Sequence, residues 1–321
     1  MRVLFFGTSA FAVPTLQALH EAASRHTILA VVTQPDRPSG RGNKVTPPPV
    51  KERALALGYE VLQPEKVRRK PFPQTVRDLA PDVLVVVSFG QIIPQSVLDI
   101  PRFGGINVHA SLLPRWRGAA PIHHAIIAGD SETGVATMQM EATLDTGPVF
   151  LEAREAIRED DTTQSLEPRL AALGGPLLVE TLERLEASDL KPTPQTETGM
   201  VYASPVTRMD GLLNPEAENS QQLAQRIRGT FPRPGASLLL GDKLVKVLEA
   251  RSLSDTTDTL KPGSLAVRRD GIAVGCANDT VLLLARVQPE NRGPMNAADY
   301  ARGARLTNED KARVPTLTPT P

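Results

Sequence analysis

Residues 83–87 read VLVVV, a run of five apolar residues, four of them β-branched. Neighbouring side chains of a strand point to opposite faces, so a strand of this composition is buried on both sides. Such strands are typical of parallel sheets that are covered by helices on each face. The run therefore predicts a strand in the middle of a parallel sheet.

Short apolar runs alternate with helical patterns on both sides of this strand. The pattern predicts strands at 3–6, 28–33 and 106–109 and helices at 11–23, 50–57 and 119–128. Such alternation indicates parallel βαβ units, so the expected fold class is α/β with a doubly wound, Rossmann-like sheet.

Polar and glycine-containing segments follow these strands. They are Gly7-Thr8-Ser9, Ser88-Phe89-Gly90 and the strand that carries Asn107 and His109. Ligands of doubly wound sheets bind beyond the carboxyl ends of the strands, so these segments predict one binding cleft. The first loop lacks two glycines of the dinucleotide fingerprint and no Walker A sequence exists, which disfavours nicotinamide and ATP. Gly7 is expected to allow a tight turn.

Asn107 and His109 share one face of their strand because they lie two positions apart. A buried amide and imidazole need partners, so the pair either faces a reactive site or bonds to a neighbouring loop. Asp145 follows a predicted strand at 134–140 and is expected near His109, although an Asx turn would also explain it. Because no Ser or Cys nucleophile stands at an elbow beside them, we predict transfer to an external nucleophile.

Two further segments could contact a ligand. Residues 111–114 read SLLP and predict a rigid ledge of two exposed leucines that suits a heterocycle, while Trp116 is expected to be packed. The loop at 34–51 has a net positive charge that would attract phosphates, although such loops are usually only solvated. Its basic residues include Arg37, Arg41 and Lys44.

The composition is that of a folded globular chain. Its 321 residues are 40% hydrophobic and 22% charged, and 36 basic residues balance 36 acidic ones, far from the composition of a dedicated nucleic-acid binder. Neither a membrane span nor a signal peptide is evident, so a cytoplasmic location is expected. The single cysteine, Cys276, excludes an internal disulfide, and no metal-binding pattern occurs.

A proline-rich stretch divides the chain. A long helix is predicted over 162–187, and prolines mark the following segment as a linker. A helix at 220–228 and short strands between Gly and Asp turns then predict a small OB-like β-barrel. We expect a catalytic domain over 1–189, a linker over 190–207, a barrel over 208–313 and a disordered tail over 314–321.

Asn107, His109, the 111–114 turn and Asp145 together resemble the formyltransferases that use 10-formyltetrahydrofolate. The wider runs are similar to the members of that family that formylate methionyl initiator tRNA. They are QPDRP at 34–38, GRG at 40–42 and PRWRGAAPI at 114–122. The likeness is dense from residue 2 to about residue 150, and the family implies a Rossmann-like domain followed by an OB-like barrel.

The second half departs from the family pattern at two places. Residues 205–212 retain Asp210 but lack a tryptophan, and Arg233 stands where a tryptophan is common. These differences concern barrel packing and tRNA contact, whereas the catalytic set is intact.

The resemblance implies roles for individual residues. Asn107 and a protonated His109 would stabilise an oxyanion, and Asp145 would hold His109. The donor, 10-formyltetrahydrofolate, would be bound as a substrate by Phe89, Gly90, Gln91, Ser111, Leu112, Leu113 and Pro114. Arg37, Arg41 and Lys44 would bind the tRNA. The resemblance implies no metal, no nucleotide cofactor and no membrane, and the enzyme is expected to be a monomer.

Other functions stay open. A 10-formyltetrahydrofolate hydrolase or a sugar-amine formyltransferase would use the same Asn107, His109 and Asp145, but the arginine-rich loop and the barrel weigh against both. A non-catalytic tRNA-binding protein would not need this intact set.

Overall fold

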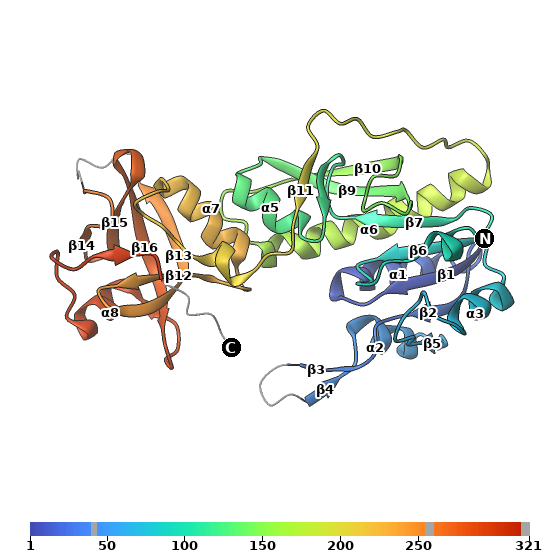
Figure 1. The fold of residues 1–321 in the computed structure, drawn as a ribbon, viewed down its shortest axis with the longest axis horizontal. Coiled ribbons are helices and arrows are strands. Elements are labelled where there is room, and N and C mark those ends of the chain that lie inside the picture. The colour runs from blue at the N-terminus through green and yellow to red at the C-terminus, as the bar shows by residue number, and fades with distance from the viewer. Residues whose placement is uncertain (40–43, 254–259, 316–321) are drawn as a thin grey trace. The chain divides into compact units, whose positions relative to one another are not determined.

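The computed structural model describes residues 1–39, 44–253 and 260–315. The chain divides into two compact units (Figure 1). The first comprises residues 1–121, 132–156 and 167–203, and the second comprises residues 122–131, 157–166 and the chain from residue 204 onward.

The first unit is built on a seven-stranded sheet. In spatial order its strands are β10 (Val149–Ala156), β9 (Glu132–Gln139), β7 (Gly105–His109), β6 (Val83–Val87), β1 (Arg2–Gly7), β2 (Thr27–Val32) and β5 (Val61–Leu62). The strands from β7 to β5 are parallel, and β9 runs antiparallel to both of its neighbours. The predicted α/β sheet is confirmed, with the VLVVV strand, buried throughout, at its middle position.

Helices cover both faces of this sheet. They are η1 (Ala10–Ala12), α1 (Val13–Glu21), α2 (Pro49–Ala56), α3 (Phe72–Leu79), α4 (Gln95–Leu98) and α6 (Thr163–Glu186), the last from residue 167. Even-numbered residues of β1 and β6 form a core cluster with α3 and α4. Odd-numbered residues of the same strands are also buried, and Gly174 of α6 lies against Val108 and Val135.

Two short pairs of strands complete the first unit. β3 (Arg37–Ser39) and β4 (Lys44–Thr46) form a hairpin within the basic loop. β8 (Arg115–Gly118) pairs in parallel with β11 (Val201–Ala203), and Thr193 pairs with Val149. The segment expected to be a linker therefore runs along strands of the first unit at two points.

Gly7 does not form the tight turn that was predicted for it. It ends β1 without a positive φ. An added Cβ would lie 2.8 Å from Cε1 of Phe5 and 2.9 Å from Cβ of Ala12. Glycine is required here because η1 follows the strand at very close range.

The second unit contains an antiparallel, nearly closed barrel. In spatial order its strands are β14 (Leu265–Val267), β15 (Ile272–Cys276), β16 (Thr280–Pro289), β13 (Lys243–Leu253), β12 (Ala236–Leu240) and β18 (Ala312–Arg313), and β17 (Met295–Asn296) pairs with β16. A bridge between Ser264 and Lys311 and a 2.8 Å hydrogen bond from the Ala312 N–H to the Gly263 carbonyl connect the two ends. The predicted small barrel is confirmed.

The second unit also contains several helices. They are α5 (Pro121–Ala128) from residue 122, η2 (Arg208–Gly211), α7 (Ser220–Thr230), η3 (Ala277–Asp279) and α8 (Ala297–Ala304). Leu223 and Ile227 of α7 and Tyr300 of α8 belong to the barrel core. Within the described ranges, no helix is both long and apolar enough to cross a membrane.

The buried Cys276 yields a first prediction. Its side chain is fully buried, and burial raises the pKa of its thiol to about 12. Since the thiolate is the reactive form, Ellman's reagent should label the native protein at least ~100-fold more slowly than the protein in denaturant. Fast labelling of one thiol in the folded protein would contradict this burial.

Candidate active site

The carboxyl ends of β1, β6 and β7 lie side by side, because the three strands are parallel neighbours (Figure 1). The loops after β1 and β6 are tied together. Thr8 Oγ1 donates to the Phe89 carbonyl at 2.7 Å, and Ser9 Oγ donates to Ser88 Oγ at 2.8 Å. Asn107 and His109 belong to the adjacent β7. The segments predicted to converge therefore share one edge of the sheet.

Asp145 meets both polar side chains of β7. Its Oδ1 accepts a hydrogen bond from Nδ2 of Asn107 at 3.4 Å, and its Oδ2 accepts the Gly118 N–H at 2.9 Å. Oδ2 also lies 3.8 Å from Nδ1 of His109. The side chain of Asp145 is 13% exposed and that of His109 is 6% exposed. The structure thus brings the three predicted residues together in a mostly desolvated cluster.

His109 has a second partner on the other side of its ring. Its Nε2 lies 2.8 Å from the carbonyl of Trp116, and because a carbonyl only accepts, Nε2 must carry a proton. Ser111 Oγ donates to the same carbonyl at 3.2 Å. Trp116 itself is only 7% exposed, so its predicted packing is confirmed.

The cluster combines an amide donor, an imidazole and a carboxylate. Such groups can stabilise a developing oxyanion and move a proton. The hydroxyl of Ser111 is buried and bonded to the Trp116 carbonyl, so it is not poised as a nucleophile. Across the residues that the structure describes, no cluster of three or more His, Cys, Asp or Glu side chains could hold a metal ion.

The turn that carries Asp145 is held from a distant part of the chain. Asp145 has a φ of 52°, in the left-handed region. Gln195 donates from Nε2 to the carbonyls of Asp145 and Gly147, and Arg117 donates to Gln195. Sequence analysis missed Gln195 because it carries no motif and lies 50 positions from Asp145. It also gave Arg117 no role of its own, although Arg117 stands in the PRWRGAAPI run.

Three of the seven residues predicted to bind the folate, Phe89, Ser111 and Leu113, have buried side chains. Leu113 is 8% exposed in a core cluster, so the expected ledge of two exposed leucines is wrong, and only Leu112 is partly exposed. Phe89 is 2% exposed, and its ring packs edge-to-face on Phe6 with centroids 5.2 Å apart. The Leu113 and Phe89 side chains lie in the core because removing their apolar surface from water stabilises the fold.

The remaining side chains near this edge differ in whether a ligand could reach them. Gln91 uses its amide inside the protein, accepting from the Val67 N–H at 3.0 Å and donating to the Pro64 carbonyl at 3.3 Å. The next residue, Ile92, is 83% exposed, and Leu144, beside Asp145, is 61% exposed. Ile92 and Leu144 could have been found from the sequence, because each is an apolar residue next to a polar loop at a strand end.

Two of the three predicted tRNA-binding residues lie in the β3–β4 hairpin. Arg37 begins β3 and Lys44 begins β4, whereas Arg41 lies outside the described residues. Asp36, just before β3, accepts hydrogen bonds from Gln63 and Lys51, which together lower the pKa of its carboxyl. This ionised Asp36 fixes the base of the hairpin.

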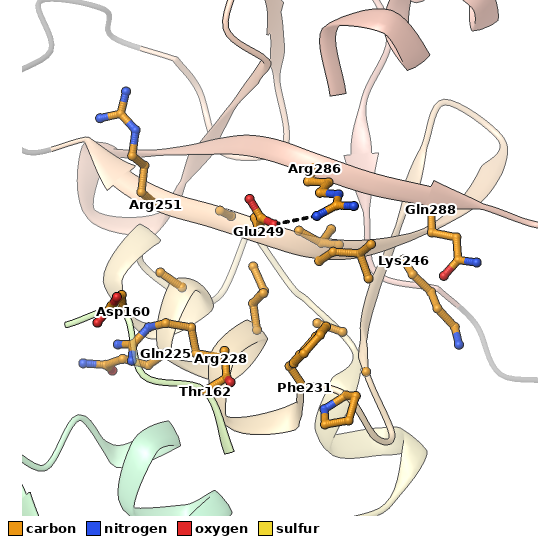
Figure 2. Close-up of a pocket in the computed structure, with 18 of the residues that line it drawn as sticks. Asp160, Thr162, Gln225, Arg228, Phe231, Lys246, Glu249, Arg251, Arg286 and Gln288 are labelled. Atoms are coloured by element: carbon orange, nitrogen blue, oxygen red, sulfur yellow. Dashed lines mark hydrogen bonds and ion pairs between the residues drawn. The ribbon is translucent and has the colours of Figure 1, made fainter. Parts of the chain in front are cut away.

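A pocket of mixed charge lies in the second unit, between α7 and the strands β13 and β16 (Figure 2). Its cations include Arg228 and Lys246, at opposite ends of the pocket in Figure 2, and Glu249 pairs with Arg286 at 3.2 Å across the two strands. Phe231, two residues before Arg233, also lines it.

Comparison with known proteins agrees with this architecture. The sequence matches the family models "Formyl transferase" over residues 1–182 and "Formyl transferase, C-terminal domain" over residues 206–305. The methionyl-tRNA formyltransferases of Myxococcus xanthus (strain DK1622) and Halorhodospira halophila (strain DSM 244 / SL1) are each 47% identical to it. These alignments cover 95% of this chain and 96% and 97% of the relatives.

Solved structures with low sequence identity share the fold. An N-formyltransferase from Helicobacter canadensis, in complex with folinic acid and dTDP-3-aminofucose, gives a TM-score of 0.67 at 14% identity and covers 89% of this chain and 98% of its own. A sugar 3N-formyl transferase gives 0.66 at 15% identity, covering 91% and 99%.

A Rossmann-like sheet with a polar cluster at its strand ends, followed by a small barrel, defines a formyl transferase. The identity of 47% over nearly the whole length is more specific than the shared fold. The chain belongs to the family of the methionyl-tRNA formyltransferases.

The geometry of Asn107 predicts a separation of activity from stability. Among the described residues its side-chain amide makes one hydrogen bond, the 3.4 Å bond to Asp145. Asn107→Ala should therefore cost less than about 1 kcal/mol of stability. It should nevertheless slow formyl transfer by ~10² to 10³-fold, as loss of an oxyanion donor does. Thermal melting and initial rates would check both, and a variant that loses rate only by unfolding would contradict the prediction.

Proposed function

We propose that this enzyme transfers the formyl group of 10-formyltetrahydrofolate to the α-amine of methionyl initiator tRNA, which yields N-formylmethionyl-tRNA for translation initiation. The observation that carries the proposal is the meeting of Asn107, His109 and Asp145 at the end of β7. The 47% identity to methionyl-tRNA formyltransferases supports the choice of acceptor. The enzyme is proposed to act in the cytoplasm, where charged tRNA is used, and as a monomer, because one chain supplies all three side chains.

The domain limits remain part of the proposal. Residues 1–189 would form the catalytic domain, 190–207 the linker and 208–313 the OB-like domain. The family models, which match residues 1–182 and 206–305, support a division in this region.

The nucleophile in this reaction needs little activation. An α-amine has a pKa of about 7.7 and is substantially neutral at physiological pH. Its lone pair attacks the formyl carbon and forms the new C–N bond, while the carbonyl electrons move to oxygen. The enzyme must therefore stabilise the resulting oxyanion rather than create a nucleophile.

Asn107 and His109 are proposed to stabilise that oxyanion. The Asn107 amide can turn its N–H from the long 3.4 Å contact toward the substrate oxygen. His109 Nε2–H would exchange the Trp116 carbonyl for the oxyanion. Preorganised donors of this kind contribute about 10² to 10³ in rate each.

Asp145 is proposed to receive the proton that the attacking amine loses. The carboxylate lies against both Asn107 and His109, so it can also hold the imidazole in place. When the intermediate collapses, the C=O bond re-forms and the bond to the folate nitrogen breaks. That nitrogen leaves with a proton, so one proton is taken and one is given in each cycle.

The folate is proposed to bind along the 89–91 and 111–114 segments. Since Phe89, Ser111 and Leu113 are buried, recognition would use their backbone groups, together with Gly90, Gln91, Leu112 and Pro114. The exposed Ile92 and Leu144 supply apolar surface for the rings.

Transfer to competing acceptors tests the function. The purified enzyme should formylate methionyl initiator tRNA rapidly with 10-formyltetrahydrofolate as the donor, and it should leave free methionine and an amino sugar nucleotide unmodified. The Asn107→Ala variant should be slower by ~10² to 10³-fold in the same assay.

The alternative outcomes separate the other functions. Formate release without tRNA formylation would indicate a hydrolase, and modification of the amino sugar would indicate a sugar formyltransferase. Tight tRNA binding without turnover would favour a non-catalytic binding protein.

Salt dependence tests the proposed tRNA contact of Arg37, Arg41 and Lys44. Arg37→Ala should weaken tRNA binding and lower the slope of log affinity against log salt by about 1, because one phosphate contact is lost. Arg102→Ala is the matched control, since this exposed arginine precedes β7 at the opposite edge of the sheet. Equal slopes for both variants would exclude Arg37 from phosphate binding.

A further inference from the structure

Gln195 makes three hydrogen bonds at the active site that the proposed chemistry does not use. Its Nε2 donates to the carbonyl of Asp145 at 2.9 Å and to the carbonyl of Gly147 at 2.7 Å. Its Oε1 accepts from Nε of Arg117 at 2.9 Å. The Gln195 amide therefore donates twice to carbonyl groups of the turn that carries Asp145.

Arg117 determines which way the Gln195 amide faces. A guanidinium only donates, so Oε1 of Gln195 must face it and Nε2 must face the two carbonyls. Arg117 is 3% exposed, and its Nη1 lies 3.6 Å from Oε1 of Glu197. A buried, charge-paired arginine fixes this orientation better than a solvated donor would.

The Asp145 turn needs such support. Asp145 is a non-glycine residue with a φ of 52°, a conformation that costs about 1 kcal/mol or more and persists only when its surroundings impose it. The preceding residues 141–144 are all exposed, so they provide little packing. The carbonyl groups of the turn are instead anchored by Gln195.

The segment that carries Gln195 is itself attached on both sides. Two residues earlier, Thr193 exchanges backbone hydrogen bonds of 2.7 and 2.8 Å with Val149 of β10. Further on, β11 pairs with β8, the strand that contains Arg117 and ends at Gly118. Gly118 is also the residue whose N–H donates to the Asp145 carboxylate.

We propose that Gln195 is a positioning residue that holds Asp145 in its catalytic place, and that Arg117 orients Gln195. The assignment rests on the proposed function in so far as Asp145 acts in formyl transfer. It makes the segment at 193–203, expected from sequence to be only a linker, a part of the catalytic apparatus.

The first test is Gln195→Met, which keeps the length of the side chain and removes all three hydrogen bonds. Its kcat should fall about 10- to 100-fold, as misplacement of a catalytic group does, with KM for folate and tRNA within about twofold of wild type. Gln74→Met is the matched control, because exposed Gln74 loses a comparable 2.8 Å bond to Asp78 on α3 and should keep full activity. An unchanged kcat in Gln195→Met would overturn the assignment.

A double-mutant cycle with Asp145→Ala separates positioning from a general structural role. If Gln195 acts through the Asp145 carboxylate, adding Gln195→Met to Asp145→Ala should lower the single-turnover rate by less than about twofold further. If the rate losses of the two single variants instead multiply in the double variant, Gln195 acts independently of Asp145 and the proposal is overturned.

Amide exchange tests the positioning without any activity assay. In Gln195→Met the Gly118 N–H, whose acceptor is the Asp145 carboxylate, should exchange about tenfold faster by NMR, while the Asp82 amide, bonded to Arg2, should not change. Unchanged exchange at Gly118 would overturn the inference even if the enzyme is active. Faster exchange in a protein that formylates no tRNA would support the positioning and refute the proposed function.

Discussion

The position of the Asp145 carboxylate is the constraint on which the rest of the site depends. A carboxylate from a loop after β9 must reach side chains at the end of β7, and it does so through a left-handed backbone conformation at Asp145. The Gly118 N–H binds the carboxylate and Gln195 binds the carbonyl groups of the turn. Preorganisation at this site is therefore largely a matter of backbone groups that side chains and neighbouring strands hold in place.

Burial of polar groups sets a second requirement. His109 and Ser111 are both buried, and a buried polar side chain without a hydrogen-bond partner would destabilise the fold. The carbonyl of Trp116 satisfies both, so the packed Trp116 places its backbone where the active site needs an acceptor. The same hydrogen bond keeps the imidazole ring in one orientation, with its other nitrogen toward Asp145.

Proteins that share this fold do not all share one formyl acceptor. Proteins that are 14% and 15% identical superpose over most of this chain, and one is a sugar 3N-formyl transferase while the other was solved with dTDP-3-aminofucose. Relatives at 47% identity carry the tRNA enzyme's name. Function lies in sites placed on a fold, so the shared sheet and barrel by themselves do not decide which acceptor is used.

Much of the fold could be predicted because it depends on local patterns. The apolar VLVVV run, the βαβ alternation and the barrel strands each need only the burial of apolar area on one or both faces. The structure also brought together Asn107, His109 and Asp145, as expected. Gly7 was misjudged because its role is close packing against Ala12, which no turn pattern reveals.

By itself, the sequence determined the parallel sheet, the barrel and the polar pair on β7, since periodicity and strand alternation follow directly from residue order. Only the tertiary structure decided that Leu113 is buried while Ile92 is exposed, and that Gln195 supports Asp145. These contacts join residues far apart in the chain. They depend on which backbone carbonyls and amides the folded chain brings within hydrogen-bonding distance, and sequence spacing carries no information about that.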